Sequence, residues 1–434
     1  MSQRKYLYWA SLSICFALYF IWPTTHTMAL RKLLLLSAAV VGLLLWLKCD
    51  GRKTIVSSSW IRYSALLLVW VIFHAAFLSQ NGNEAWRELL GQWLPPYLAM
   101  LAGIGLALAN RSLSPRTFKL YLLAMLAAQP VFYLFFTLLK SAQTGHLAMG
   151  SENWGLTDHK MSLTFYADLL AAWACAKIID NVKSGAAISS IFPLLLPVAL
   201  AFYVAVFADS LNGIILVSGC LALTATVVVY LRRETISRKA LAATVLLLVF
   251  SLYLFSSSSY VVAKRESLVS NTRIAVNIDT YQNWINFPLL GLPTDEEGVR
   301  VKESYYLRVA YATAGLRTII EHPLGYGVTR HAFERLIQQE YPSAKIANSH
   351  NAYIDLVSAV GFPALLLLAL VIVSVYRQLR QSHSEWTQPA AWMIGIIVTH
   401  WMLDPISRDH YFETFLFLIG LFSTLTLDSQ QKHG

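Results

Sequence analysis

Apolar residues in this chain are gathered into long runs that short polar segments separate. Many runs are about 17 to 23 residues long, the length that a helix needs to cross ~30 Å of hydrocarbon at 1.5 Å per residue. None of the runs alternates between apolar and polar positions, as the strands of an outer-membrane barrel would. The pattern therefore predicts an all-α, polytopic integral membrane protein.

Twelve spans are predicted, of which the second, third, fourth and eleventh are short or weakly apolar. They cover residues 7–22, 33–47, 64–78, 97–109, 117–139, 161–179, 188–208, 211–231, 241–255, 354–376, 390–403 and 411–427. This division predicts nine transmembrane helices in residues 1–255, a long loop in 256–353, called the outer segment below, and three helices with a short tail in 354–434. The first span lacks a small-residue cleavage site, so we expect it to be retained as an anchor.

The orientation follows from Lys and Arg, which accumulate in cytoplasmic loops. With the N-terminus inside, the cytoplasmic segments hold 18 of these residues and the short outer loops hold six: Arg31, Lys32, Arg87, Lys140, Lys160 and Arg408. Both termini are therefore predicted to be cytoplasmic. The outer segment, which lies between the ninth and tenth spans, is predicted to face outward.

The composition agrees with a membrane chain, since 56% of residues are hydrophobic and only 13% are charged. A soluble domain has close to a quarter of charged residues, and 21 Gly and 14 Pro are too few for a collagen-like chain. The net charge of +10 resides mostly in cytoplasmic loops, because the outer segment has 10 basic and nine acidic residues. The charge thus reports topology, and no nucleic-acid partner is predicted.

Neither a disulfide framework nor a metal site is predicted. The outer segment contains none of the four cysteines, and no pair of its His and acidic residues has the spacing of a His-Glu-x-x-His motif. We expect no cofactor and no catalytic metal.

The most informative stretch runs from Arg308 to Gly361. A helix is predicted over residues 305–320, which the Pro-Leu-Gly-Tyr-Gly run at 323–327 ends, and a second helix over residues 332–339. His322, Gly325 and Gly327 are expected to build a turn with positive φ, with ligand contact by His322 a secondary role. His350-Asn351 then precedes Gly361 by nine intervening residues.

This pattern resembles the O-antigen ligase family, which is related to O-antigen polymerases and bacterial protein O-oligosaccharyltransferases. In that family a His followed by Asn, Ser or Gln, nine residues and a Gly ends the large outer loop, and an Arg precedes a Pro-Leu-Gly-x-Gly turn. Residue-level similarity covers about 305–364, and the twelve-span architecture fits as well. The chain departs from the family at Ala364, where Gly, Thr or Tyr is usual, and in the turn at 208–213, which lacks the usual Arg.

The resemblance implies a GT-C-like glycosyltransferase in the inner membrane of a Gram-negative bacterium. Such a ligase moves O-antigen glycan from undecaprenyl pyrophosphate to a sugar hydroxyl of lipid A-core at the periplasmic face. Arg308 would neutralise the pyrophosphate, because guanidinium is a planar and permanently charged donor. His350 would be the general base for the acceptor hydroxyl. Asn351 would orient that imidazole, bind a sugar hydroxyl or cap the next helix.

Further residues are candidates for substrate binding. We expect Lys160 to replace the Arg that the turn at 208–213 lacks, with Arg265 and Arg273 as rival cations. Asp404, Arg408 and Asp409 in the last outer turn would bind sugars or pair with one another. Arg317 is expected to lie on a solvated helix face, and the aromatic residues Trp284, Tyr305 and Tyr306 are expected to anchor the chain at the membrane interface.

Two other functions compete with the ligase. An O-antigen polymerase would use the same donor but transfer the glycan to another lipid-linked repeat. A flippase or transporter of lipid-linked glycan would break no bond and usually carries ionisable residues near mid-membrane. Here the predicted spans hold almost no charge apart from Asp168, which is predicted to face the cavity near the outer end of the sixth span.

Overall fold

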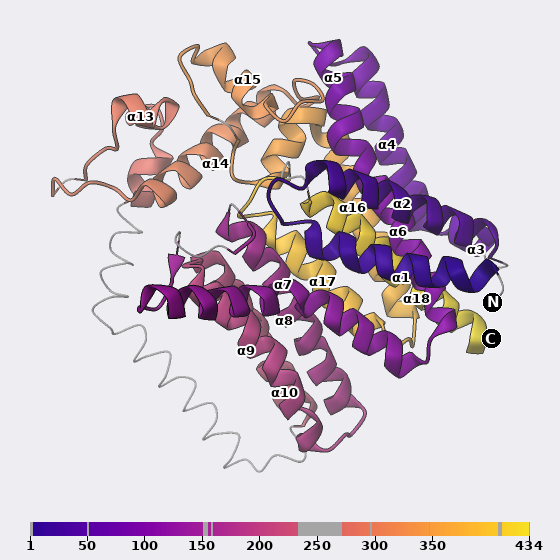
Figure 1. The fold of residues 1–434 in the computed structure, drawn as a ribbon. Coiled ribbons are helices and arrows are strands. Elements are labelled where there is room, and N and C mark those ends of the chain that lie inside the picture. The colour runs from indigo at the N-terminus through magenta and orange to yellow at the C-terminus, as the bar shows by residue number, and fades with distance from the viewer. Residues whose placement is uncertain are drawn as a thin grey trace.

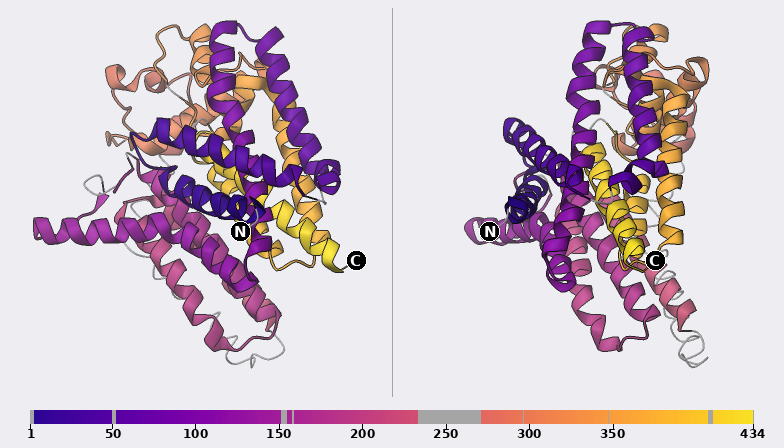
Figure 2. Two further views of the ribbon diagram at one scale, coloured as in Figure 1. Left: turned by 45° about the vertical axis from the view of Figure 1, so that its right-hand side comes forward. Right: turned by 90° about the vertical axis from the view of Figure 1, so that its right-hand side faces the viewer.

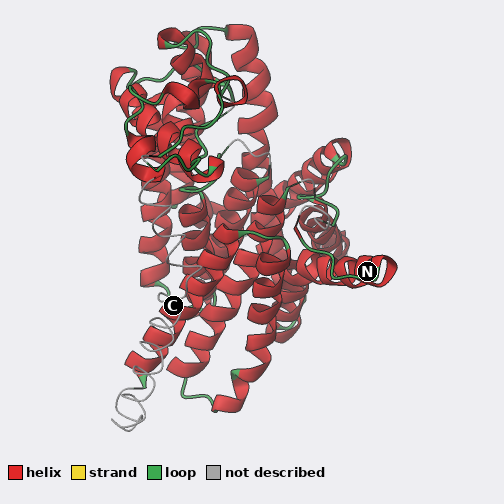
Figure 3. Cartoon of the chain, turned by 90° about the vertical axis from the view of Figure 1, so that its left-hand side faces the viewer, coloured by secondary structure: helices red, strands yellow, loops and turns green. Residues whose placement is uncertain are grey.

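The computed structural model describes residues 3–49, 52–150, 155–157, 159–232, 271–295, 297–346, 348–406 and 410–433. In these ranges the chain is helical, and one isolated bridge between Thr294 and Arg300 is the only β-type pairing (Figure 3). The membrane-embedded and connecting helices before the outer segment are α1 (Gln3–Ile21), α2 (Met28–Leu47), α3 (Arg52–Ser57), α4 (Ser59–Phe77), α5 (Gly82–Glu88), η1 (Leu89–Trp93), α6 (Leu94–Ala109), η2 (Asn110–Ser112), α7 (Pro115–Thr144), α8 (Lys160–Lys183), η4 (Ile188–Ser190), α9 (Phe192–Phe207) and α10 (Leu211–Leu231). The rest are η5 (Gln282–Ile285), α13 (Phe287–Leu290), α14 (Glu303–Glu321), α15 (Ala332–Glu340), α16 (Ala352–Gln381), α17 (Thr387–His400) and α18 (Tyr411–His433).

Every predicted span overlaps one of these helices, except the ninth, at 241–255, which lies outside the described residues. Eight helical segments in the described ranges are long and apolar enough to cross a membrane, so the all-α polytopic class is confirmed. The second and third spans are longer than predicted, since α2 has 20 residues and α4 has 19. The fourth is part of a continuous 31-residue stretch from Gly82 to Ser112. The count of twelve spans and the place of the long loop remain predictions.

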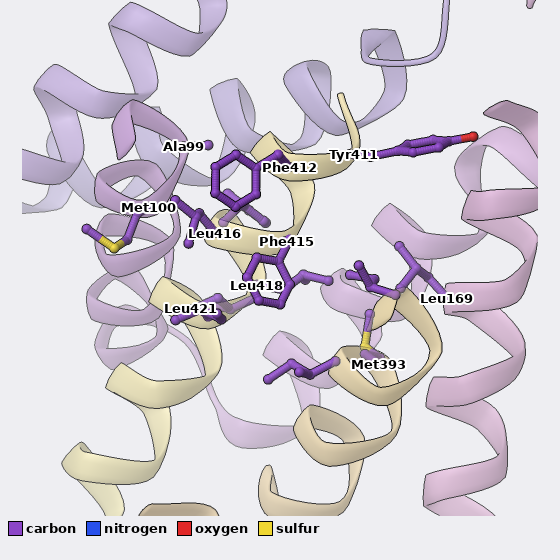
Figure 4. Packing of buried hydrophobic residues seen from close by; sticks show 14 of the residues in the cluster. Ala99, Met100, Leu169, Met393, Tyr411, Phe412, Phe415, Leu416, Leu418 and Leu421 are labelled. Atoms are coloured by element: carbon purple, nitrogen blue, oxygen red, sulfur yellow. The ribbon is translucent and has the colours of Figure 1, made fainter. Parts of the chain in front are cut away.

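The centre of the membrane part is formed by α6, α8 and α18. More than three quarters of the apolar window is buried in each of them, against 28% in α2 and 22% in α10, whose remaining surface is left for lipid. Figure 4 shows Phe412, Leu416 and Leu421 of α18 lying beside Met100 of α6. The two helices approach so closely at Gly103 that a Cβ there would lie 2.1 Å from the Phe417 carbonyl oxygen. Small residues are what permit such close backbone packing in membranes.

The outer segment has a hydrophobic core of its own. The side chains of this core include Ile278, Trp284, Tyr306, Phe333 and Ile337, and it extends to the first turns of α16. Figures 1 and 2 show α13, α14 and α15 grouped at one end of the molecule beside α5. Trp284 and Tyr306 are fully buried in this core, so the expectation that they anchor the chain at the membrane interface is wrong for both.

The two helices predicted in this segment are confirmed. The predicted helix 305–320 corresponds to α14, and the predicted helix 332–339 corresponds to α15. Pro323 follows directly after the C-cap residue His322 and cannot continue the helix, so α14 ends where the sequence predicts it. The buried face of α14 packs against α16, and this contact sets the position of Arg308 relative to the start of α16.

Candidate active site

The Pro-Leu-Gly-Tyr-Gly turn and Gly361 form one structural unit. Gly361 interrupts α16 with φ 77° and ψ 174°, and a Cβ at that position would lie 2.7 Å from Leu324 Cα. The backbone N–H groups of Tyr326 and Gly327 donate to the carbonyls of Ser358 and Ala359, at 2.7 and 3.0 Å. Positive φ at Gly325 and Gly327 is confirmed. The spacing between the turn and Gly361 therefore reflects backbone packing that only glycine permits.

Two side chains of α4 satisfy carbonyls that this kink leaves free. Trp70 Nε1 donates to the Val360 carbonyl at 2.8 Å, and His74 Nε2 lies 2.7 Å from the Leu324 carbonyl. A kinked helix needs such partners, because buried carbonyls without hydrogen bonds are costly. The sequence contains no spacing signal that links α4 to this site. Only the packing of α4 on α16 reveals these two residues.

His350 lies in a tight hairpin immediately before α16. Asn351 is the N-cap residue, and its Oδ1 accepts from the N–H groups of Tyr353 and Ile354 at 3.0 and 3.2 Å. The Ser349 N–H donates to Asp355 Oδ1 at 2.9 Å, so the hairpin is tied to the first turn of the helix. His350 itself has φ 56°, a conformation that costs a non-glycine residue roughly 1 kcal/mol or more. Strain of this kind is concentrated at functional sites.

The imidazole of His350 stacks on α14. The His350 and Tyr311 rings are 6.1 Å apart between centroids and inclined by only 14°. Burial raises the pKa of Tyr311 well above its ordinary value, so the phenol stays protonated near neutral pH and cannot serve as a base there. The stacking on Tyr311 orients the ring of His350. Of these two side chains, only the imidazole can act as a base near neutral pH.

Arg308 lies one turn before Tyr311 on the same helix. Its guanidinium donates to Asn212 Oδ1 at 3.3 Å and is half-buried. Asn212 belongs to the turn at 208–213, where ligases usually carry an Arg. Helix α14 thus places Arg308 at that turn. One helical turn further along, Tyr311 of the same helix contacts the ring of His350.

Lys160 approaches the same turn from α8. Its ammonium group donates to the Asp209 carbonyl at 2.9 Å, and the Ser210 hydroxyl lies 3.4 Å from Thr164 Oγ1 one turn further along α8. Asp209 has φ 53°, which makes it a second strained non-glycine residue at this place. The hypothesis that Lys160 lies next to the turn without Arg is therefore supported by the geometry. We call Lys160, Asp209, Asn212, Arg308 and His350 the cation–histidine site.

Other predicted residues lie elsewhere. His322 caps the C-terminus of α14, and its carbonyl accepts from the Gly325 N–H at 2.9 Å, in keeping with a role in the turn. Arg273 is exposed at the start of the described part of the outer segment. Arg265 and Arg408 lie outside the described residues. Their predicted roles are untested, as are those of the other site residues.

Arg317 has the structural role that was expected. Both of its terminal nitrogens bind the Asp279 carboxylate at 2.8 to 3.0 Å on the exposed face of α14. This guanidinium holds the pKa of Asp279 below its ordinary value. Asp279 thus already compensates the charge of Arg317, so we do not assign Arg317 to substrate binding.

A buried chain of ionisable residues joins α8 and α17. His400 Nδ1 lies 3.4 Å from Asp168 Oδ2, and His400 Nε2 lies 3.9 Å from Asp404 Oδ2. All three side chains are at most 2% exposed. Asp168 thus faces His400 in the protein interior, and Asp404 lies beneath the surface on which a sugar ligand was expected. No sequence signal points to His400, which is the last residue of α17, whereas Asp404 lies in the turn after that helix.

The described residues contain no group of three or more His, Cys, Asp or Glu side chains that is arranged to hold a metal ion. The side chains of the cation–histidine site are instead two cations, an amide, an imidazole and the carboxylate of Asp209, whose backbone carbonyl accepts from Lys160. Such a set suits an anionic ligand together with a hydroxyl that must lose a proton.

The family resemblance is confirmed by comparison with known proteins. Residues 196–369 match the family model described as O-antigen ligase, while no curated protein matches the sequence significantly. The matched range contains the turn at 208–213, Arg308, the Pro-Leu-Gly-Tyr-Gly turn and the stretch from His350 to Gly361. That family acts on lipid-linked glycans in lipopolysaccharide biosynthesis, with a glycosyltransferase-like activity. The chain is therefore a multi-pass membrane protein that is similar to the O-antigen ligase family over residues 196–369.

Proposed function

We propose that this protein is an O-antigen ligase that transfers glycan from undecaprenyl pyrophosphate to a sugar hydroxyl of lipid A-core. One observation carries the proposal: Arg308 and Lys160 both contact the turn at 208–213, and the strained His350 stacks on Tyr311, one turn from Arg308 on α14. The family usually supplies an Arg from this turn. In this chain two cations from neighbouring helices reach it instead, so the positive charge that a pyrophosphate needs is kept.

The two cations have different tasks in this proposal. Arg308 presents a fork of N–H donors that matches two phosphate oxygens, and Lys160 supplies a point charge. Both are only partly exposed, so their interaction with an anion is less screened than at an open surface. Together they stabilise the charge that develops on the pyrophosphate as it leaves.

His350 accepts the proton of the acceptor hydroxyl. The hydroxyl oxygen forms a bond to the anomeric carbon of the donor glycan while the bond from that carbon to the phosphate oxygen breaks. The electron pair of the broken bond leaves with undecaprenyl pyrophosphate, and the proton passes to the imidazole and later to solvent. Tyr311 holds the ring in place, and Asn351 fixes the hairpin as helix cap. No nucleotide is required, since the donor carries its own leaving group.

We place this reaction at the periplasmic face of the inner membrane, without a metal ion. The support is the count of cations in the loops, which predicts that the outer segment faces outward. An O-antigen polymerase would need the same donor chemistry and the same base. The two differ in the acceptor, so a measurement on products must separate them.

The test is a lipopolysaccharide gel from a strain that lacks this gene, complemented with wild type or His350→Ala, together with a blot for lipid-linked O-antigen. For a ligase, the deletion strain shows bare core with long polymer on undecaprenyl pyrophosphate. Core that bears a single repeat would instead show a polymerase. Full restoration by an inserted His350→Ala protein would overturn the assignment of the base.

A transporter remains the second candidate because of the buried chain of Asp168, His400 and Asp404. Ionisable residues inside a membrane protein are often parts of a proton pathway. A transporter would leave lipid-linked glycan on the cytoplasmic side in the deletion strain. Protection of that glycan from an added periplasmic glycosidase would favour this function over the ligase.

A further inference from the structure

A second group of cations lies around a cavity outside the cation–histidine site. The cavity has a volume of about 350 Å³, which is in the range of small-molecule sites in proteins. It lies between the first turns of α2, the segment of α5 and η1, the loop before α15 and the start of α18. Its charged lining residues are Arg31, Lys32, Arg87 and Arg330, with the two acids Glu88 and Glu413.

Positive charge is concentrated around this cavity, although Lys and Arg are otherwise few in the predicted outer loops of this chain. The short outer loops are predicted to hold only six Lys and Arg residues, and three of them, Arg31, Lys32 and Arg87, line this one cavity. Cations are depleted from translocated loops. Their convergence from α2 and α5, which are separate in sequence, indicates a requirement for positive charge at this place.

The two acids offset two of the four positive charges, so the lining keeps a net formal charge of +2. Glu88 Oε1 lies 3.2 Å from Arg330 Nε, and Glu413 Oε2 accepts from Trp22 Nε1 at 2.5 Å. The Arg31 guanidinium is positioned by the Trp22 carbonyl at 2.9 Å. Lys32 and Arg87 are exposed and form no ion pair within the ranges that the structure describes.

The cavity is also partly apolar, and this feature selects the class of ligand. Met28, Leu35 and Leu90 line it, and Met28 and Leu90 are 48% and 63% exposed. Exposed apolar side chains beside four cations match an amphiphile with an anionic head group better than a free phosphate ion.

The cavity shares lining residues with a smaller one that reaches the first turn of α16. The smaller cavity, of about 40 Å³, shares Glu88, Gln92 and Arg330 with the larger one and is also lined by Asp355. Asp355 accepts from the N–H of Ser349, the residue next to His350. A ligand in the larger cavity would therefore approach the base through groups other than Arg308 and Lys160.

We propose that this cavity binds a phosphate group of the acceptor glycolipid, while Arg308 and Lys160 bind the pyrophosphate of the donor. The inference rests on the proposed function, since it assigns two anionic lipids to two separate cation groups that share one base. An anionic phospholipid of the membrane carries the same head-group chemistry. The experiment therefore has to distinguish the acceptor from bulk lipid.

The test uses the full-length protein in nanodiscs and the double variant Lys32→Gln/Arg87→Gln, with Arg335→Gln as the control. Arg335 is an exposed cation of α15 that lines neither cavity. Each removed charge should weaken binding of the phosphorylated acceptor about fivefold. We expect the KM for acceptor to rise more than tenfold in the double variant, with the KM for donor and kcat within about twofold of wild type.

A phosphatase-treated acceptor provides the decisive comparison. Wild type should lose affinity for it, and the double variant should bind treated and untreated acceptor equally. Equal discrimination by wild type and double variant would overturn the proposal. So would loss of phosphatidylglycerol binding with an unchanged KM for acceptor, because the cavity would then hold bulk lipid.

A direct binding measurement separates this proposal from the proposed function. Native mass spectrometry of the protein with phosphorylated acceptor needs no transfer reaction. Phosphate-dependent binding that the double variant lacks would support the cavity even if the protein did not ligate. Binding without any dependence on phosphate would refute the cavity and leave the ligase function untouched.

Discussion

The cation–histidine site and the buried chain of Asp168, His400 and Asp404 both contain a histidine between polar partners, yet they differ in access. His350 is half-buried and strained, and its ring stacks on Tyr311, one turn from the partly exposed Arg308 on α14. His400 is 1% exposed and is enclosed by two carboxyl groups and aromatic rings. A substrate can reach the first histidine only. The comparison indicates that the kind of residue does not define the site, whereas exposure does.

The largest effect is expected from removal of His350, the accessible histidine of the two. His350→Ala should lower glycan transfer roughly 10² to 10⁴-fold, as is typical for loss of a general base. Little packing is lost, so the amount of inserted protein should be unchanged. Transfer is measured with purified donor and acceptor, and insertion by a blot of membranes. An inserted variant with full activity would remove the reason for distinguishing the two histidines.

Arg308→Gln is expected to have the next largest effect. Loss of a charged donor that stabilises a developing charge typically costs about 10² in rate. Arg308→Lys should recover only part of this loss, because ammonium cannot form the same fork of hydrogen bonds. Steady-state kinetics should show the loss mainly in kcat. A loss confined to the KM for acceptor would assign Arg308 to the other substrate.

Lys160→Ala should reduce transfer by about tenfold, the effect of one hydrogen bond to a charged group. The informative companion is Asn212→Arg, which returns an Arg to the turn at 208–213. If Lys160 compensates for the missing Arg, the double variant should recover most of the activity that Lys160→Ala loses. The kinetics of the two single variants and the double variant give this coupling directly. Wild-type transfer by Lys160→Ala would contradict the role.

The sequence was sufficient to predict most helices of the described ranges, while the outer position of the chemistry and the roles of Arg308 and His350 remain predictions. Apolar runs of fixed length determine the spans, and the turn motif identifies the ends of the outer segment. The position of Lys160 next to the turn was also predicted, because a pyrophosphate needs compensating charge. The kink at Gly361 and its partners Trp70 and His74 could not be predicted, since they depend on packing between distant helices.

The buried chain was not predicted for the same reason. Asp168 appeared as a single intramembrane acid, and the position of His400 within the short eleventh span gave no sign of contact with it. The burial of Trp284 was missed because an aromatic residue in a loop between spans was interpreted by its usual place at a membrane interface. Only the separate hydrophobic core of the outer segment accounts for it.

The buried chain should respond to substitution by a loss of stability. Asp168→Asn removes a carboxylate from His400 but keeps the side-chain volume. We expect about 1 kcal/mol of destabilisation, the size of interhelical polar contacts in membrane proteins. Transfer per folded molecule should stay within about twofold, which a thermal melt combined with kinetics would show. Loss of transfer with an unchanged melting temperature would move this chain into the mechanism or favour the transporter.

The smallest expected effect is at Arg317, which shares α14 with Arg308. Asp279 has a lowered pKa beside Arg317, so their interaction favours the folded state above the ordinary pKa of Asp279 and is lost as the pH falls through its folded value. Both side chains are more than half exposed, and solvent screens exposed pairs strongly. Arg317→Gln should therefore leave transfer at the wild-type level and change the melting temperature little, even at neutral pH. A large loss of transfer would show that any positive charge on α14 contributes to catalysis, and the distinction between Arg308 and Arg317 would fail.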